Sequence, residues 1–370
     1  MLTWILGLSG VVAAVPVQAS DDHGAQASFA VRAQHLRLFG NEVVHDGVLV
    51  VENGKVRYAG DAKRAGEIGH DVIEHDGWLS AGLVACRSYS GTRGDTLEGK
   101  RPLTAEARIA DVVALDHVDF ERALAAGITT MVIAPSAANV VSGATAVVKT
   151  HGASFVSREA HLALSFSDSA LRFNRYPTSY MAALGELENA LARPSGVWKR
   201  VADGKLPVLL DAGSRDEIQR AVRFAKDHKL QGALSRAPWA GELADDVKQS
   251  GLAVIAGPFD VGTAERSLAS VVALAKAGVP LAFGVDAPWN SEEGLRLSAA
   301  MCMRAGLDGR TAWESLTSTA AAVAGAGTRV GKLVSGYDAD FVLWSGDPLD
   351  LTSRVVAVYV DGQRAFGGAE

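Results

Sequence analysis

Charged side chains stand at the ends of several short apolar segments of this sequence. Arg87 lies in Ala85-Cys-Arg-Ser-Tyr89, Asp211 ends Leu209-Leu-Asp, and Asp286 lies in Gly284-Val-Asp-Ala-Pro288. A carboxylate in such a place can act as a general base. A buried arginine must be paired, because an isolated buried charge is costly. We therefore expect Arg87 to form an ion-pair cluster with Asp211 and Asp286.

Other residues of chemical interest are weaker candidates. Lys149 ends an apolar segment and is expected to pair with an acid, although a carboxylated lysine is an alternative. His151 and His161 match no ligand motif and are expected to be loop or surface histidines; the alternative is one weak metal held with Asp286. Cys86 is expected to be buried packing rather than a nucleophile.

The elements that must position these residues follow from hydrophobic periodicity. Eight apolar segments alternate with amphipathic helices over about 250 residues, which predicts an α/β fold with a (β/α)8 TIM-type barrel. The predicted strands are Gly82–Ser88, Thr129–Ala134, Ala144–Lys149, His161–Ser165, Pro207–Ala212, Gly232–Ser235, Leu252–Gly257 and Pro280–Val285. Ser214-Arg-Asp-Glu217 is a capping box that begins one helix, and Gly278 ends another. Functional side chains of a barrel lie at the C-terminal ends of its strands, so Arg87, Asp211 and Asp286 are expected at one mouth.

Both ends of the chain are rich in β-strand signals. Gly47–Gly60 predicts a hairpin with an Asn-Gly turn, and Asp338–Gly362 predicts a second one. We therefore expect a small β-sandwich domain built from residues 28–81 and 336–370, with the barrel formed by residues 82–335.

Four stretches resemble the amidohydrolase superfamily, specifically its imidazolonepropionase-like members. They are Asp46–Val56, Gly77–Val84, Phe120–Thr130 and Gly331–Trp344 with the following Gly346-Asp-Pro348. The resemblance extends from Phe29 to Phe366. It implies the barrel and sandwich described above, and hydrolysis of C–N bonds in amides or cyclic amides other than peptides. It also implies a metal-bound water, with an aspartate after strand eight as general base.

The sequence departs from this family at the metal ligands. The resemblance implies His-x-His at the end of strand one and single histidines after strands five and six. The residues at these four positions are Arg87, Tyr89, Asp211 and Ser235, with Arg236 as an alternative to Ser235. Only strand eight keeps its residue, Asp286, and none of the nine histidines falls at a matching strand end. Without four imidazoles no metal or other cofactor is expected; the alternative is one weakly bound divalent metal such as zinc.

An intact scaffold beside a replaced ligand set is compatible with three functions. The first is a non-catalytic partner or scaffold of an active relative, as a homo-oligomer or hetero-oligomer. The second is a divergent hydrolase of non-peptide C–N bonds with a residual catalytic site around Asp286. The third is a binding module for an anionic small molecule, held through Arg87 with Lys149 and Arg236 as further contacts.

Composition and the first residues of the chain limit the class of protein and indicate where it is located. The 370 residues carry a formal net charge of −6 and are 48% hydrophobic, which excludes a disordered chain and argues against nucleic-acid binding. Two cysteines cannot form a disulfide framework. Residues 1–19 are uncharged, mostly apolar and end in Val-Gln-Ala, which predicts a signal peptide and an exported protein, periplasmic or secreted, with no membrane attachment after cleavage. An uncleaved membrane anchor is the alternative.

Overall fold

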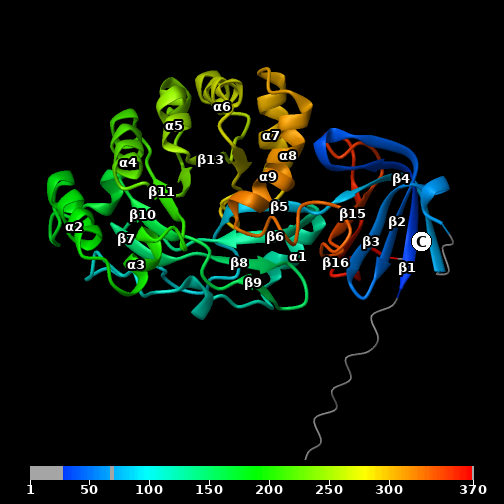
Figure 1. Cartoon of the computed structure of the whole chain (residues 1–370), viewed down its shortest axis with the longest axis horizontal. Coiled ribbons are helices and arrows are strands. Elements are labelled where there is room, and N and C mark those ends of the chain that lie inside the picture. The colour runs from blue at the N-terminus through cyan, green and yellow to red at the C-terminus, as the bar shows by residue number, and fades with distance from the viewer. Residues whose placement is uncertain (1–27, 67–70, 369–370) are drawn as a thin grey trace, which may run out of the picture.

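The chain folds into a barrel that joins a β-rich unit at one end (Figure 1). The computed structural model describes residues 28–66 and 71–368. The predicted signal peptide at residues 1–19 lies outside the described residues. Within them, every helix is too short or too polar to cross a membrane.

Two hydrogen-bonded sheets form the barrel wall, one in the order β14-β13-β12-β11-β10-β7 and the other in the order β5-β6-β8-β9. Their strands are β5 (Leu83–Ser88), β6 (Ile128–Ile133), β7 (Val141–Ala144), β8 (Ala146–Lys149), β9 (Phe155–Ser157), β10 (Leu162–Ser165), β11 (Val208–Asp211), β12 (Gly232–Ser235), β13 (Ala253–Ala256) and β14 (Leu281–Phe283). Thr145 alone separates β7 from β8, which links the sheets on one side. On the other side the N–H of Val285 donates to the carbonyl of Arg87 at 2.9 Å. The wall is therefore continuous, and each predicted strand is present.

The third predicted strand, Ala144–Lys149, departs from the expected parallel arrangement. β7 is antiparallel to β10, and β8 is antiparallel to β6. Because the antiparallel neighbours β6 and β8 need no crossover helix, residues 134–140 lead from β6 into the segment that forms β7 and β8 without one. The prediction of eight strands that all alternate with helices is wrong at this position.

Helices cover the outside of the barrel wall, where α2, α4, α5, α6 and α7 stand side by side (Figure 1). The helices are α1 (Val118–Ala125), α2 (Tyr180–Ala192), α3 (Gly196–Ala202), α4 (Arg215–Asp227), α5 (Ala244–Ser250), α6 (Glu265–Ala277), α7 (Gly294–Arg304), α8 (Gly309–Leu316) and α9 (Ser318–Val323). The predicted capping box is confirmed: Ser214 Oγ accepts from Glu217 N, and Glu217 accepts from Ser214 N. Gly278, at φ 80°, ends α6 as predicted.

Glu217 also fixes the loops that follow β10 and β11. Its carboxylate accepts from the N–H of Gly213 at 2.8 Å, the N–H of Asp168 at 2.9 Å and the Tyr180 hydroxyl at 2.8 Å. Burial alone would raise the pKa of Glu217, but the hydrogen bonds from Ser214 and these groups hold it below its usual value. One side chain of α4 therefore orders two segments beside the barrel mouth.

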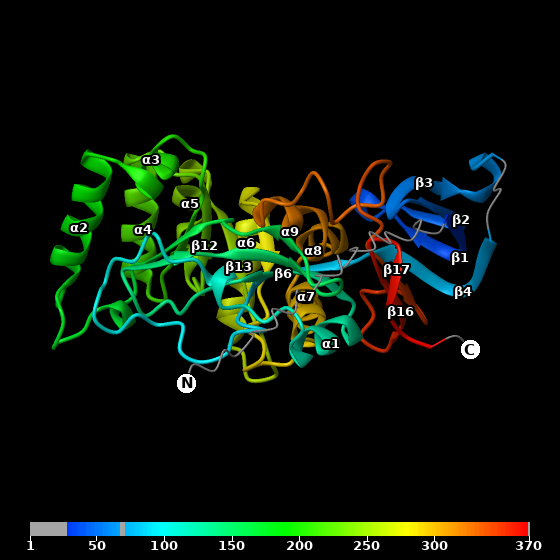
Figure 2. The same cartoon turned by 90° about the horizontal axis from the view of Figure 1, so that it is seen from below.

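A seven-stranded sheet in the order β17-β16-β15-β4-β1-β2-β3 unites the two ends of the chain (Figure 2). Its strands are β1 (Phe29–Arg37), β2 (Val43–Glu52), β3 (Lys55–Asp61), β4 (Asp71–Ala81), β15 (Phe341–Trp344), β16 (Val355–Val360) and β17 (Gln363–Phe366). The β2–β3 turn places Asn53 and Gly54 at φ 53° and 73°, as a type I′ turn requires. Trp344 Nε1 donates to Ser80 Oγ at 2.9 Å, across 264 residues of sequence. The predicted hairpins and their contribution from both ends are confirmed.

Candidate functional site

Arg87 lies at the centre of the barrel mouth and is only 2% exposed. Its Nε donates to Asp286 Oδ1 at 2.5 Å and its Nη2 to Asp286 Oδ2 at 3.0 Å, which makes a bidentate pair. Nη1 donates to Ser235 Oγ at 2.6 Å, and Nη2 donates to the carbonyl of Gly257 at 2.8 Å. One guanidinium thus connects β5 to the segments that end β12, β13 and β14.

Local backbone irregularities place these groups. The β5–β6 ladder shifts register between Ala85 and Ser88, and such irregularities re-aim a side chain next to a site. Asp286 and Arg236 have φ of 52° and 56°, a left-handed conformation that costs a non-glycine residue about 1–3 kcal/mol. Asp286 is held there by its ion pair and by its N–H, which donates to the carbonyl of Arg87 at 3.2 Å. The left-handed backbone at these two residues therefore destabilises the fold slightly and holds the charged side chains of the mouth in a fixed arrangement.

Asp211 is the second carboxylate of the mouth, and only 6% of it is exposed. Its ion pair is with Arg236, at 3.5 Å between Nε and Oδ2, rather than with Arg87 as predicted. Burial raises the pKa of Asp211 to about 6, although Arg236 and Arg87 lower it. The predicted cluster is therefore confirmed for Arg87 with Asp286, while Asp211 pairs with the neighbouring arginine and titrates close to neutral pH.

Tyr89 fills much of the space beside Asp211. Its ring packs on Trp289, with 4.5 Å between the centroids, and burial raises the pKa of its hydroxyl. The space left among the side chains of Arg87, Tyr89, Asp211 and Ser235 is a cavity of about 20 Å³. Such a volume holds about one water molecule.

These residues do not fit the divalent metal that the family resemblance implies. In the part of the chain that the structure describes, no three His, Cys, Asp or Glu side chains are grouped as metal ligands. The guanidinium of Arg87 lies between Ser235 and Asp286, where a cation would be repelled, and it already binds both oxygens of Asp286.

Lys149 lies at the opposite end of the barrel. Because β8 is antiparallel to β6, its last residue pairs with Thr130 near the start of β6, away from the mouth. The Lys149 Nζ is 2.6 Å from Asp340, 2.9 Å from Asp338 and 3.0 Å from Asp361. The predicted pairing with an acid is confirmed, but Lys149 as a ligand contact of the mouth is wrong.

Two other predicted residues prove to be structural. His161 is 1% exposed, with its ring nitrogens 2.8 Å from the Val323 carbonyl and 3.1 Å from Thr145 Oγ1. His161 lies in the loop just before β10, as one of the two alternatives predicted, but it is not at the surface, because the end of α9 covers it. Cys86 is fully buried and its thiol donates to the Ala320 carbonyl, as expected of packing.

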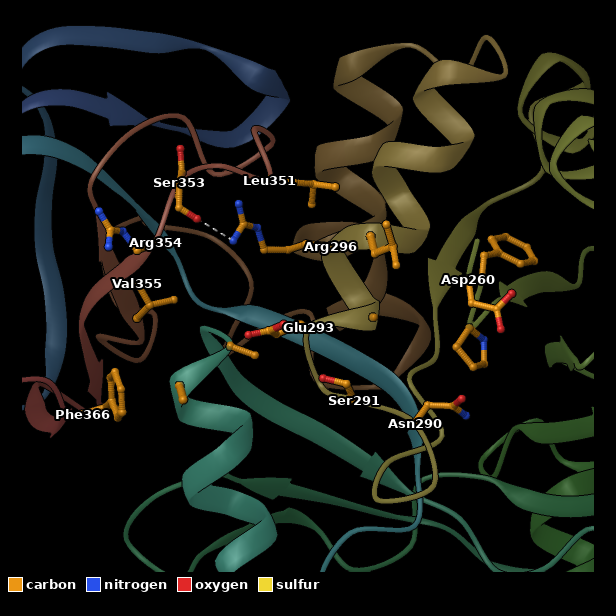
Figure 3. A pocket seen from close by; sticks show the side chains of 16 residues that line it. Asp260, Asn290, Ser291, Glu293, Arg296, Leu351, Ser353, Arg354, Val355 and Phe366 are labelled. Atoms are coloured by element: carbon orange, nitrogen blue, oxygen red, sulfur yellow. Dashed lines mark hydrogen bonds between the residues drawn. The ribbon is translucent and has the colours of Figure 1, made fainter. Parts of the chain in front are cut away.

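Sequence patterns do not reveal cavities, and two lie near the mouth. One of about 190 Å³ is lined by Arg87, Arg236 and Asp286 together with apolar side chains of β13 and α6. The other, of about 550 Å³, lies between α7 and the segment that leads into β16 (Figure 3). There Arg296 donates to the carbonyls of Pro348, Asp350 and Ser353. The guanidinium of Arg296 therefore binds backbone carbonyls and connects the barrel to the sandwich.

Comparison with known proteins identifies the fold's relatives. A family model described as "Amidohydrolase family" matches residues 223–366. The chain is 26% identical over 383 residues to an imidazolonepropionase of Xanthomonas euvesicatoria, covering 85% of this chain and 91% of that protein. It is 37% identical over 81 residues to amidohydrolase tasK of Hapsidospora irregularis, which covers only 8% of that protein.

Solved structures show the same architecture. An amidohydrolase from Thermotoga maritima superposes with a TM-score of 0.84 at 24% identity, covering 92% of this chain and all of that one. A zinc-bound adenosine deaminase from Xanthomonas campestris gives 0.58 at 19% identity, covering 92% of this chain and 93% of that one. Together with the family model and the distant imidazolonepropionase homologues, the barrel joined to a sandwich from both chain ends makes this protein similar to the amidohydrolase superfamily in sequence and in fold.

Proposed function

We propose that this chain is a non-catalytic member of the amidohydrolase superfamily and serves as a partner or scaffold of an active relative. The observation that carries this proposal is the position of Arg87, whose guanidinium stands among the residues that replace the family's ligands. Four of its hydrogen bonds go to Asp286, Ser235 and Gly257.

The chemistry of these groups supports the proposal. Hydrolysis of a C–N bond needs a group that takes a proton from water, and an arginine guanidinium stays protonated in proteins. Both oxygens of Asp286 are engaged by Arg87. The space among Arg87, Tyr89, Asp211 and Ser235, about 20 Å³, is too small for an amide substrate. Asp286 also lines the neighbouring cavity of about 190 Å³, where both of its oxygens are already held by Arg87.

The proposed setting is extracytoplasmic. Cleavage after residue 19 would release the chain into the periplasm or the medium, and the active relative would have to be exported with it. The association would be a homo-oligomer or a hetero-oligomer built on the shared barrel.

One observation favours a second function. Asp211 has a pKa of about 6, so near neutral pH part of the population carries a buried carboxylate able to accept a proton. In this alternative the chain hydrolyses non-peptide C–N bonds without a metal. Its substrates would be amides or cyclic amides, the class suggested by the imidazolonepropionases to which it is distantly similar.

The test combines metal content with hydrolysis. Purified mature protein is incubated with zinc, dialysed and assayed by mass spectrometry, then tested on linear amides, lactams and an imidazolone. We expect well below one zinc per chain and no hydrolysis above buffer. The matched variants are Asp286→Asn and Asp211→Asn, each a change of one carboxylate to an amide.

Two results would overturn the proposal in different ways. About one zinc per chain that Asp286→Asn loses would establish a metal site with an unfamiliar ligand set. Hydrolysis that persists with chelator and disappears only in Asp211→Asn would establish the second function.

A further inference from the structure

The cavity of about 190 Å³ combines two kinds of wall. Arg236 and Asp286 belong to the charged mouth of the barrel. Val254 and Ala256 on β13 and Val271 and Leu274 on α6 belong to the apolar layer between strands and helices. Such a site suits a ligand with one charged end and one apolar end.

The arginine that can meet a ligand is Arg236 rather than Arg87. Arg87 is buried and donates four hydrogen bonds to other groups of the protein. The Arg236 side chain is 47% exposed, and its ion pair among the described residues is the 3.5 Å contact with Asp211, longer than a good hydrogen bond. Its left-handed backbone, at φ 56°, holds this exposed cation at the rim of the cavity.

We propose that the cavity binds a small monocarboxylate with a short aliphatic chain, its carboxylate on Arg236 and its chain between β13 and α6. The inference rests on the proposed function, because it assigns a ligand to a mouth that does not hydrolyse. The volume limits the chain: an apolar cavity of about 150 Å³ accommodates benzene, so about six carbons fit here.

To bind Arg236, a ligand carboxylate must replace or share the ion pair that Arg236 forms with Asp211. The charged and titratable groups that interact with Asp211 are Arg236, Arg87, Asp286, Glu217 and Tyr89. When Asp211 is ionised it competes with a ligand carboxylate for Arg236, and when it is protonated that competition disappears. Since its pKa is about 6, binding is expected to be tighter at about pH 5.5 than at about pH 8, and Asp211→Asn should abolish the difference.

The test is calorimetric titration of the full chain with acetate, butanoate, hexanoate and octanoate, and with hexanol as the uncharged probe. Each added methylene should lower Kd about fourfold up to hexanoate, with little gain beyond it. Arg236→Gln should bind hexanoate no better than hexanol. Arg310→Gln, an exposed arginine paired with Glu314 at a distance from the cavity, is the matched control.

Two further variants probe the apolar wall in opposite directions. Ala256→Leu should abolish the gain with chain length, and Val271→Ala should shift the best chain toward octanoate. An affinity that ignores chain length in the wild type, or that survives in Arg236→Gln, overturns the inference. Zinc content and hydrolysis are separate readouts: a metal-free, inactive protein that binds no carboxylate refutes this inference alone, whereas zinc-dependent hydrolysis refutes the proposed function.

Discussion

Two buried cations lie at opposite ends of the barrel, and carboxylates surround each of them. Arg87 at the mouth pairs with Asp286, whose side chain keeps 18% of its surface exposed. Lys149 at the base pairs with Asp338 and Asp340, and all three of these side chains are only 1% exposed. The first cluster adjoins two cavities, whereas the second lies between the barrel and the C-terminal strands, where its third acid, Asp361, is 37% exposed.

In both clusters a buried cation is neutralised by carboxylates, but the two clusters have different roles in the molecule. A planar guanidinium can bind one carboxylate with two donors and still reach a hydroxyl and a carbonyl, which lets it connect several strand ends. A compact ammonium such as that of Lys149 can contact several carboxylates at once, and here all of them come from the C-terminal segment. The base cluster therefore holds two parts of the fold together, and the mouth cluster fixes the shape of a site.

The largest effect is expected at the base. Lys149→Met should leave Asp340 and Asp338 buried with less compensation, and breaking a buried pair from one side costs about 3–5 kcal/mol. Urea denaturation of the full chain measures the loss. Lys199→Met is the control, since that lysine is 65% exposed and its pair with Asp203 contributes little. Equal stability of the two variants would mean that the base is not a structural joint.

A smaller loss is expected at the mouth. Arg87→Met should cost about 2–4 kcal/mol, because the unpaired Asp286 keeps 18% of its side chain exposed to water. Arg32→Met, which removes an exposed pair with Asp46, should cost less than about 1 kcal/mol. The same denaturation series decides the order, and a loss above that of Lys149→Met would reverse the comparison.

The smallest effect is a dependence on pH that belongs to the mouth. Asp211 has a folded pKa of about 6, above its ordinary 3.8, so the folded state binds more protons between these values and stability falls as pH rises through this window. Its contribution should decrease by about 1 kcal/mol between pH 5 and pH 7.5. Because other groups titrate too, the readout is the difference between wild type and Asp211→Asn. A difference that does not change with pH would contradict the prediction.

Much of the fold could be predicted because apolar segments and turn residues mark strands and hairpins directly. The direction of β7 and β8 could not, since a run of aliphatic residues reads the same in both directions. That single reversal also displaced Lys149 from the mouth to the base. Arg87 and Asp286 could be paired from the barrel rule alone. The partner of Asp211 could not, because it depends on the left-handed backbone of Arg236.

The pairing of β4 with β15 has a consequence for biosynthesis. Trp344 and Ser80 meet across 264 residues, so β4 emerges from the ribosome long before its neighbour exists. At about 5–20 residues per second this wait lasts about 13–50 seconds. Throughout it one edge of the N-terminal sheet has no partner, and such edges invite aggregation. Nascent chains of this protein should therefore depend on a chaperone until the last strands arrive.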